Sequence, residues 1–282
     1  MAVVLITGCS SGIGPRTALA FARRGDRVYA TMRRAERGRQ LVDLAAGEGL
    51  DVRVLELDVT EDLSVQQAVQ EVLDAEGRID VVVNNAGLLH IGSVELLSDE
   101  AMRETFETNV FGPVRVLKAV LPAMRAAGSG VVVNVSSTAG RVSAFASFWS
   151  YMASKHSLSV LSDSLAMELE PFGIRVISIE PGFVRTPVVE KAARPSGASP
   201  YSAFDEAAYT FLAGGVGGGA DPDTLAQAIV DAVDHDDGRI HFLVGDDANM
   251  FVDQYMSSTD AEMTVFFKEV LGLANEPAQV LA

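Results

Sequence analysis

The chain is poor in cysteine, in positive charge and in long hydrophobic runs. Cys9 is its one cysteine, so no disulfide forms within the chain, and a reducing compartment such as the cytoplasm is expected. Lys and Arg number 22 against 38 Asp and Glu, and this net charge of −16 disfavours nucleic acid as a partner, because phosphate binding needs a basic face. The apolar runs are too short to span a membrane and the first residues lack a secretory pattern, so no membrane partner is expected.

Positive charge is concentrated at the start of the chain. Residues 1–53 hold nine Lys or Arg against five Asp or Glu, whereas the rest of the chain is strongly acidic. A basic region in an acidic protein predicts a local anion site, the alternative being an Arg-rich helix face in solvent. The four histidines lack the spacing of metal ligands, so no metal is expected.

Short apolar segments alternate with helical patterns along most of the chain. Strands are predicted over residues 2–7, 27–31, 52–57, 80–84, 130–135, 174–180 and 240–244. Helices are predicted over residues 16–24, 62–75, 99–127, 151–170, 223–234 and 260–271. This alternation predicts one α/β domain over residues 1–282, a doubly wound, Rossmann-type parallel sheet of about seven strands with helices on both faces.

The regular pattern loosens after Pro187. Residues 188–222 contain three prolines and the glycine-rich run 214–219, which predicts a mobile substrate lid with a glycine hinge or a disordered insertion. Four aromatic side chains of this segment are candidates to close over a hydrophobic ligand: Tyr201, Phe204, Tyr209 and Phe211. Residues 245–282 are predicted to form a C-terminal extension near the substrate pocket.

A glycine-rich loop joins the first predicted strand to the first helix. Its sequence TGCSSGIG lets the backbone turn tightly and approach a pyrophosphate, whose charge the helix N-terminus favours. The alternative is a plain strand–helix turn. The predicted cofactor-binding residues of this loop are Gly8, Ser10, Ser11, Gly12, Ile13 and Gly14.

The second predicted strand ends in Met32, Arg33 and Arg34 instead of an acid. An acid here holds the 2′-hydroxyl of NAD, whereas a guanidinium binds the 2′-phosphate of NADP. The sequence therefore favours NADP(H) over NAD(H), with Arg33 as the first candidate and Arg34 and Arg16 as helpers. The alternative is two surface arginines, with Met32 lining the adenine pocket.

The third and fourth strand ends carry further cofactor candidates. Asp58, followed by Val59, either accepts a hydrogen bond from the adenine amino group or caps the following helix. The small residues of the NNAG motif, Asn85, Ala86 and Gly87, allow a ribose to lie against the backbone, the alternative being a tight turn.

Tyr151 and Lys155 lie one helical turn apart on one helix face. A nearby ammonium favours the phenolate, so we expect Lys155 to lower the pKa of Tyr151 toward the range of a general acid/base.

Together these motifs resemble the short-chain dehydrogenase/reductase family, over residues 3–187 and in the family's order. The segments VVLITGCSSGIG and VYATMR are most similar to the hydroxysteroid and retinol dehydrogenase branch, which commonly uses NADP(H). The resemblance implies that Tyr151 exchanges a proton with substrate. It also implies that Lys155 holds the nicotinamide ribose and that Asn109 orders a water linking Lys155 to solvent.

A strand-end serine is implied to hydrogen-bond the substrate oxygen. Ser137 is the first candidate, since it lies 14 residues before Tyr151 and the family's serine about 13, and Thr138 and Ser136 stay open as alternatives. The residues implied on the nicotinamide side are Pro181, Gly182, Val184 and Thr186. A homodimer or homotetramer built on helices 99–127 and 151–170 is also implied.

An apolar wall around the reacting groups predicts a hydrophobic substrate. Its candidate residues are Phe145, Phe148, Trp149, Phe183 and Val188, the alternative being that the aromatic stretch packs in the core or between subunits. We therefore predict an NADP(H)-dependent oxidoreductase acting on a hydroxyl/carbonyl pair of a steroid, retinoid, polyketide or aryl ketone. The alternatives are a non-catalytic NADP(H) sensor and an epimerase or dehydratase on the same scaffold.

Overall fold

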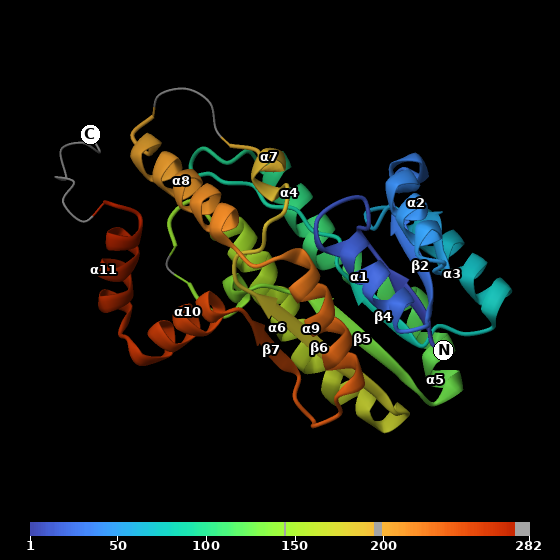
Figure 1. Cartoon of the computed structure of the whole chain (residues 1–282). Helices are drawn as coiled ribbons and strands as arrows, with labels where there is room; N and C mark the ends of the chain where they lie inside the picture. Colours follow the sequence, from blue (N-terminus) through green and yellow to red (C-terminus); the bar gives the residue numbers. More distant parts are fainter. Residues whose placement is uncertain (144, 195–198, 274–282) are drawn as a thin grey trace.

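The computed structural model describes residues 1–143, 145–194 and 199–273. Its sheet has seven parallel strands in the order β3-β2-β1-β4-β5-β6-β7 (Figure 1). The strands are β1 Val3–Ile6, β2 Arg27–Met32, β3 Val52–Glu56, β4 Val81–Asn84, β5 Gly130–Val135, β6 Ile174–Pro181 and β7 His241–Val244. This doubly wound α/β sheet confirms the predicted fold class.

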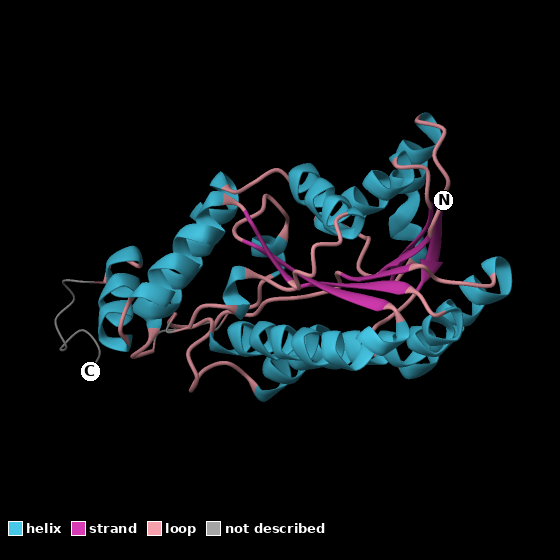
Figure 2. Cartoon of the chain, turned by 90° about the horizontal axis from the view of Figure 1, so that it is seen from below, coloured by secondary structure: helices cyan, strands magenta, loops and turns pink. Residues whose placement is uncertain are grey.

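Helices cover both faces of the sheet, as Figure 2 shows. The helices are α1 Ile13–Arg23, α2 Arg39–Gly47, α3 Asp62–Glu76, α4 Asp99–Phe106, α5 Gly112–Ala127, α6 Trp149–Leu169, α7 Val188–Lys191, α8 Ser202–Gly218, α9 Pro222–Asp234, α10 Asp246–Ser257 and α11 Asp260–Val270. Short 3₁₀ turns occupy η1 Ala35–Gly38, η3 Thr138–Gly140 and η4 Glu170–Phe172, and a π turn occupies η2 Glu107–Phe111. No helix in the described ranges combines the length and apolar character needed to cross a membrane.

Alternating strand residues divide the core into two layers. Val4 and Ile6 of β1 pack with α1, α2 and α9, whereas Val3 and Leu5 pack with α3, α5 and α6. Successive strand side chains point to opposite faces, so strands buried on both sides are apolar at nearly every position. A third apolar cluster lies beyond the carboxyl edge of the sheet, where Leu212 of α8 and Val252 of α10 pack near Met152.

The predicted helix 99–127 is interrupted in the structure. It consists of α4, the π turn η2 and α5. The interruption falls just before Pro113, whereas Pro122 lies inside α5. A π turn inserts an extra residue and re-aims the side chains that follow, and such turns are frequent at functional sites. This one carries Asn109.

The loose segment after Pro187 also differs from its prediction. Residues 202–218 form the helix α8, and the glycines of its last turns lie within that helix instead of in a hinge loop. A Cβ at Gly215 would lie 2.6 Å from the ring of Phe183, so this glycine lets the helix pack closely on that ring. Helices α2 and α10 were not expected, and residues 195–198 of the predicted lid lie outside the described residues.

Candidate active site

A single cavity of about 850 Å³ lies at the carboxyl ends of the strands. It is open at the point where β1 separates β2 from β4, which is where doubly wound sheets bind ligands. One end is formed by the glycine loop and the end of β2, and the other by aromatic side chains from α8, α10 and α11. The predicted cofactor residues that line it are Gly8, Ser10, Ser11, Gly12, Ile13, Arg33, Arg34, Asp58, Val59, Asn85, Ala86, Gly87, Tyr151, Lys155, Pro181, Gly182, Val184 and Thr186.

The glycine loop is held in a tight turn by the motif that follows β4. Gly8 and Gly12 have φ angles of 75° and 70°, a region that glycine adopts without strain. The Asn85 side chain donates to the carbonyls of Thr7 (2.8 Å) and Gly8 (3.2 Å), and a Cβ at Gly8 would lie 2.7 Å from Ala86. The loop therefore packs closely on the NNAG turn, and its other side lines the cavity at the start of α1.

Gly14 does not line the cavity. A Cβ there would lie 2.5 Å from the carbonyl oxygen of Gly8, so Gly14 serves close packing beneath the loop. Cys9 is also buried, and burial raises the pKa of its thiol to about 12. A thiol that stays protonated is a poor nucleophile, so Cys9 is a packing residue.

Cations gather at the end of β2. Arg33, Arg34 and Arg37 line the cavity, and Lys191 reaches it from α7 and donates to the hydroxyl of Ser11. Within the described ranges no carboxylate forms an ion pair with any of these four cations. No sequence pattern predicts Arg37 or Lys191 at this site, because only the fold brings α7 to this end of the cavity.

Asp58 lines the cavity and stabilises a turn. Its Oδ1 accepts hydrogen bonds from the backbone N–H (3.0 Å) and the hydroxyl (2.8 Å) of Thr60. Helix α3 begins only after Glu61, so Asp58 is not the N-cap that one sequence reading proposed. Its other oxygen has no hydrogen bond among the described residues, which is compatible with the adenine reading.

Tyr151 and Lys155 project from the first turns of α6 toward the end of β5. The Lys155 Nζ lies 5.8 Å from the centroid of the Tyr151 ring and donates to the carbonyl of Val135 at 2.8 Å. Burial lowers the pKa of Lys155 to about 8. Burial also raises the pKa of Tyr151, while a hydrogen bond with Ser137 acts in the opposite direction.

The expected lowering of the tyrosine pKa by the lysine is therefore wrong for this structure. Desolvation disfavours the phenolate, and it outweighs the opposing effect of Ser137. The phenol is thus held in its protonated form, which suits a proton donor.

The three strand-end hydroxyls have different partners. Ser137 caps η3 by accepting from the N–H of Ala139 and bonds to Tyr151. Ser136 is buried and donates to the carbonyl of Lys155, and Thr138 donates to the carbonyl of Pro181 at 2.9 Å. Ser137 is the hydroxyl of the three that bonds to Tyr151, and the other two stabilise the backbone around it.

Asn109 lies behind the cavity and does not line it. Its Nδ2 donates to the carbonyl of Leu88 (2.9 Å) and to the Ser154 hydroxyl (3.0 Å), and its Oδ1 accepts from the N–H of Leu88 (2.9 Å). A Cβ at Gly87 would lie within 3.4 Å of Asn109 and 3.7 Å of Lys155, so the two polar groups flank that glycine.

The opposite end of the cavity is aromatic. Phe145, Phe148, Phe183 and Val188 line it as predicted. The sequence missed most of the remaining apolar lining, which consists of Leu89, Val142, Met152, Leu212, Val216, Phe251 and Phe267. The ring of Phe145 lies 4.8 Å from the rings of both Phe211 and Phe267, which belong to α8 and α11.

Trp149 is not part of this wall. It is half-buried, does not line the cavity, and its buried indole N–H has no hydrogen-bond partner among the described residues. It begins α6, and helical geometry turns it away from Tyr151 two residues later. Of the aromatic residues expected in the lid, Phe211 lines the cavity, whereas Tyr201, Phe204 and Tyr209 do not.

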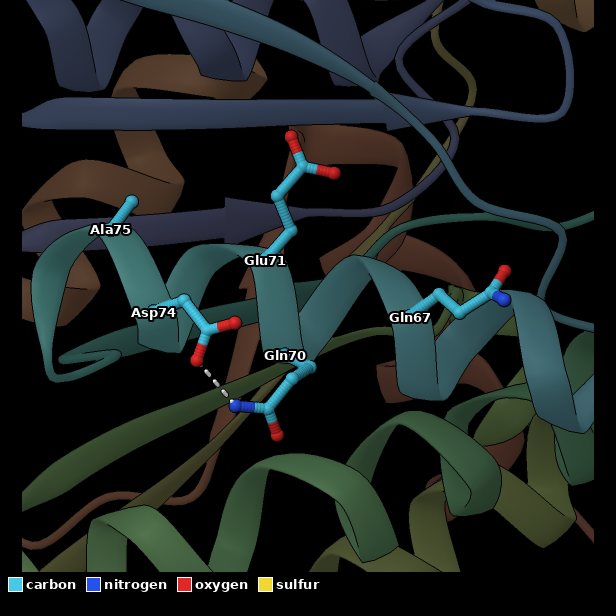
Figure 3. Close-up of a pocket in the computed structure, with 5 residues that line it drawn as sticks. All are labelled: Gln67, Gln70, Glu71, Asp74 and Ala75. Carbon is cyan, nitrogen blue, oxygen red and sulfur yellow. Dashed lines mark hydrogen bonds between the residues drawn. The ribbon is translucent and has the colours of Figure 1, made fainter.

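A second hollow is a shallow groove on the outer face of α3 (Figure 3). It is lined by Gln67, Gln70, Glu71, Asp74 and Ala75, and Gln70 donates to Asp74 at 2.7 Å. All five residues come from one helix, and the groove has no counterpart of the Tyr151–Lys155 pair found in the large cavity.

Comparison with known proteins agrees with this geometry. Residues 2–196 match the family model described as short chain dehydrogenase. The chain is 40% identical over 185 residues to 3-ketodihydrosphingosine reductase of Bacteroides thetaiotaomicron, covering 65% of this chain and 64% of that protein. It is 42% identical over 188 residues to retinol dehydrogenase 8 of Homo sapiens, covering 65% and 59%. The matched part is thus under two thirds of each relative's length.

Solved structures share the whole architecture. A short-chain dehydrogenase from Streptomyces avermitilis superposes with a TM-score of 0.83 at 38% identity, covering 96% of this chain and 98% of the other. A Burkholderia phymatum short chain dehydrogenase/reductase in complex with NAD has a TM-score of 0.82 at 25% identity, with 93% and 94% covered. A Thermococcus sibiricus alcohol dehydrogenase complexed with 5-hydroxy-NADP has a TM-score of 0.71 at 28% identity, with 86% and 96% covered. The matching family model, the fold and the Ser137–Tyr151–Lys155 cluster together show that the chain belongs to the short-chain dehydrogenase/reductase family.

Proposed function

We propose that this protein is an NADP(H)-dependent oxidoreductase that interconverts a hydroxyl and a carbonyl group on a hydrophobic substrate. The observation that carries the proposal is the placement of Ser137, Tyr151 and Lys155 where the polar and aromatic ends of one cavity meet. A dinucleotide in the polar end would bring its reactive ring to the same point.

The residues present fit such a dinucleotide. The glycine loop lines the cavity at the start of α1, where the free backbone N–H groups of a helix N-terminus favour a pyrophosphate. The cations at the end of β2 have no carboxylate partner among the described residues, although the whole chain carries a net charge of −16. An anion with more charge than a pyrophosphate alone would compensate them, which supports NADP(H) over NAD(H).

A bound nicotinamide supplies or accepts the hydride. In the direction of reduction, the protonated Tyr151 donates its phenolic proton to the substrate oxygen. Ser137 donates a hydrogen bond to the same oxygen as negative charge develops on it. Lys155 places a positive charge beside the phenol, which stabilises the phenolate left after transfer. Oxidation of an alcohol reverses these proton steps.

The aromatic end supports a lipophilic substrate. Phenylalanine rings from five separate parts of the chain form its walls, so a polar substrate would lose hydration there without gaining hydrogen bonds. Two relatives are named for retinol and for 3-ketodihydrosphingosine. We therefore include steroid, retinoid, polyketide and aryl ketones in the proposed substrate class.

Substitution of Tyr151 by Phe tests the proposal. We expect Tyr151→Phe to reduce NADPH-linked ketone turnover by about 10²- to 10⁴-fold, because it removes the proton donor and leaves the ring in place. The affinity for NADPH, measured by calorimetry, is expected to change by less than about twofold. Tyr209→Phe is the matched control, because Tyr209 does not line the cavity.

The assay uses purified protein with NADPH or NADH and a panel of ketosteroids, retinal, aryl ketones and β-ketoesters. A fully active Tyr151→Phe variant would refute the mechanism, and equal affinity for the two cofactors would remove the NADP part of the proposal.

A further inference from the structure

Helix α7 lies between the two ends of the cavity. It spans only Val188–Lys191 and follows Pro187 directly. Val188 lines the cavity and packs against the apolar cluster that contains Phe148 and Met152. Lys191, one turn later, donates to the Ser11 hydroxyl in the glycine loop. One short helix therefore contributes both to the substrate wall and to the polar end.

The segment around α7 is anchored on both sides. A Cβ at Gly12 would lie 3.4 Å from Thr186, so the chain leaving β6 passes over the glycine loop. After the helix, the Ala193 carbonyl accepts from the N–H of Ile91 at 2.9 Å, and the Ala193 N–H donates to His90 at 3.3 Å. The position of Lys191 is thus defined by contacts before and after it.

The charged groups around the Lys191 ammonium favour the binding of an anion. Burial, Arg37 and Arg33 together lower its pKa, and the neighbouring Glu190 only partly opposes them. A hydrogen bond to one neutral hydroxyl is weak compensation for an ammonium brought close to two guanidinium groups. None of these three cations has a carboxylate ion-pair partner in the ranges that the structure describes.

We infer that Lys191 binds the 2′-phosphate of NADP(H) together with Arg33 and Arg37, and so ties the wall of the substrate pocket to the cofactor's phosphate. This inference rests on the proposed NADP(H) dependence. With the phosphate bound, Lys191 is held against the glycine loop and Val188 is held in the substrate wall. The cofactor's 2′-phosphate then favours substrate binding as well as cofactor binding.

The first experiment measures phosphate recognition without turnover. Adenosine 2′,5′-bisphosphate and adenosine 5′-monophosphate are titrated calorimetrically into wild type, Lys191→Met and Lys191→Arg. We expect Lys191→Met to weaken the bisphosphate about tenfold and the monophosphate less than twofold, and Lys191→Arg to restore most of the loss. Lys268→Met is the matched control, because Lys268 is exposed on α11 outside the cavity. Equal weakening of both ligands would assign Lys191 to the pyrophosphate site and overturn the inference.

The second experiment measures the link to the substrate wall. Hydrogen exchange of residues 188–193 is followed with and without the bisphosphate. We expect the bisphosphate to slow exchange of this segment in wild type but not in Lys191→Met. If the bisphosphate leaves exchange unchanged in wild type, the proposed coupling is overturned.

The variant Arg33→Ala distinguishes a failure of this inference from a failure of the proposed function. If Arg33→Ala weakens NADPH more than NADH but Lys191→Met does not, the inference fails and the proposed function stands. If wild type binds NADPH no better than NADH and the bisphosphate no better than the monophosphate, both the inference and the proposed NADP(H) dependence fail.

Discussion

The fold strongly affects the ionisation of Lys155. It is 5% exposed, and its ammonium has one protein partner among the described residues, the carbonyl of Val135. Lowering its pKa from 10.5 to about 8 corresponds to about 3 kcal/mol of cost for the charged form. A buried cation of this kind is expected where chemistry needs it, at the expense of stability.

This cost predicts a pH dependence for Lys155→Met. Below about pH 8 the lysine is charged in both the folded and the unfolded chain, and wild type bears the full cost. Between about pH 8 and 10.5 the folded lysine loses its proton first, so the unfolded chain binds more protons. We therefore expect the free energy of unfolding of wild type, relative to Lys155→Met, to rise by up to about 3 kcal/mol over this range.

Denaturant unfolding of both proteins from pH 7 to pH 10 measures this difference. Lys118→Met, which changes an exposed lysine of α5, is the control and should show no comparable trend. A flat difference across the range would mean that Lys155 ionises at its ordinary pKa.

At the scale of elements, β6 and β7 are joined by a charged network next to the active site. Glu180 is fully buried, and its Oε1 accepts from His241 Nδ1 at 2.6 Å and from the Ser178 hydroxyl at 3.1 Å. His241 Nε2 donates to Asp163 of α6 at 2.7 Å, and Arg141 lies 3.9 Å from the second Glu180 oxygen. These carboxylates favour the imidazolium and raise the pKa of His241.

The network predicts that stability falls as pH rises. A raised pKa in the folded state stabilises the protein below the unfolded value of about 6.5, and this contribution is lost as pH rises through the folded pKa. We expect the thermal midpoint of wild type to decrease over that interval, and His241→Gln to reduce the decrease.

Scanning calorimetry from pH 5 to pH 9 measures the effect, with the exposed His235→Gln as control. If the thermal midpoints of His241→Gln and wild type changed in parallel with pH, His241 would not be the positive charge that stabilises Glu180.

At the scale of the whole molecule, two large apolar side chains are exposed on one side of α6. Val160 and Met167 of α6 are 65% and 81% exposed and lie seven residues apart, on the same side of the helix. Phe111 of η2 and Phe172 of η4 are also exposed. Apolar side chains grouped on one helix face are typical of a surface that binds another copy of the chain.

We expect Met167→Asp to shift the protein to a smaller oligomer, because a carboxylate at the centre of an apolar interface loses its hydration. Light scattering after size-exclusion chromatography measures the mass. Met256→Asp, which changes a methionine 75% exposed on α10, is the control. A monomeric wild type would contradict the expected dimer or tetramer.

Local sequence was informative where a pattern has one structural solution. All seven strands were predicted within two residues of their ends, because strands buried on both faces are continuously apolar. The glycine loop, the NNAG turn and the Tyr151–Lys155 pair were each predicted as functional motifs, and they line one cavity at the carboxyl edge of the sheet. In each case neighbouring residues carry the information.

Sequence reasoning failed where contact partners are distant. Helix α8 reads as a loose glycine-rich stretch, because the ring of Phe183 that fits against Gly215 comes from another part of the chain. Phe251 and Phe267 complete the aromatic wall only because α10 and α11 return to the cavity. Trp149 was misplaced because the start of α6 decides which way its side chain points.

By itself, the sequence determined the parallel sheet and its glycine loop, since strand period and turn chemistry depend on adjacent residues. Only the tertiary structure decided the pKa directions of Tyr151 and Lys155, because desolvation depends on everything packed around a group. It also decided that Lys191 reaches the glycine loop, since its hydrogen bond to Ser11 joins residues that lie 180 positions apart in the sequence.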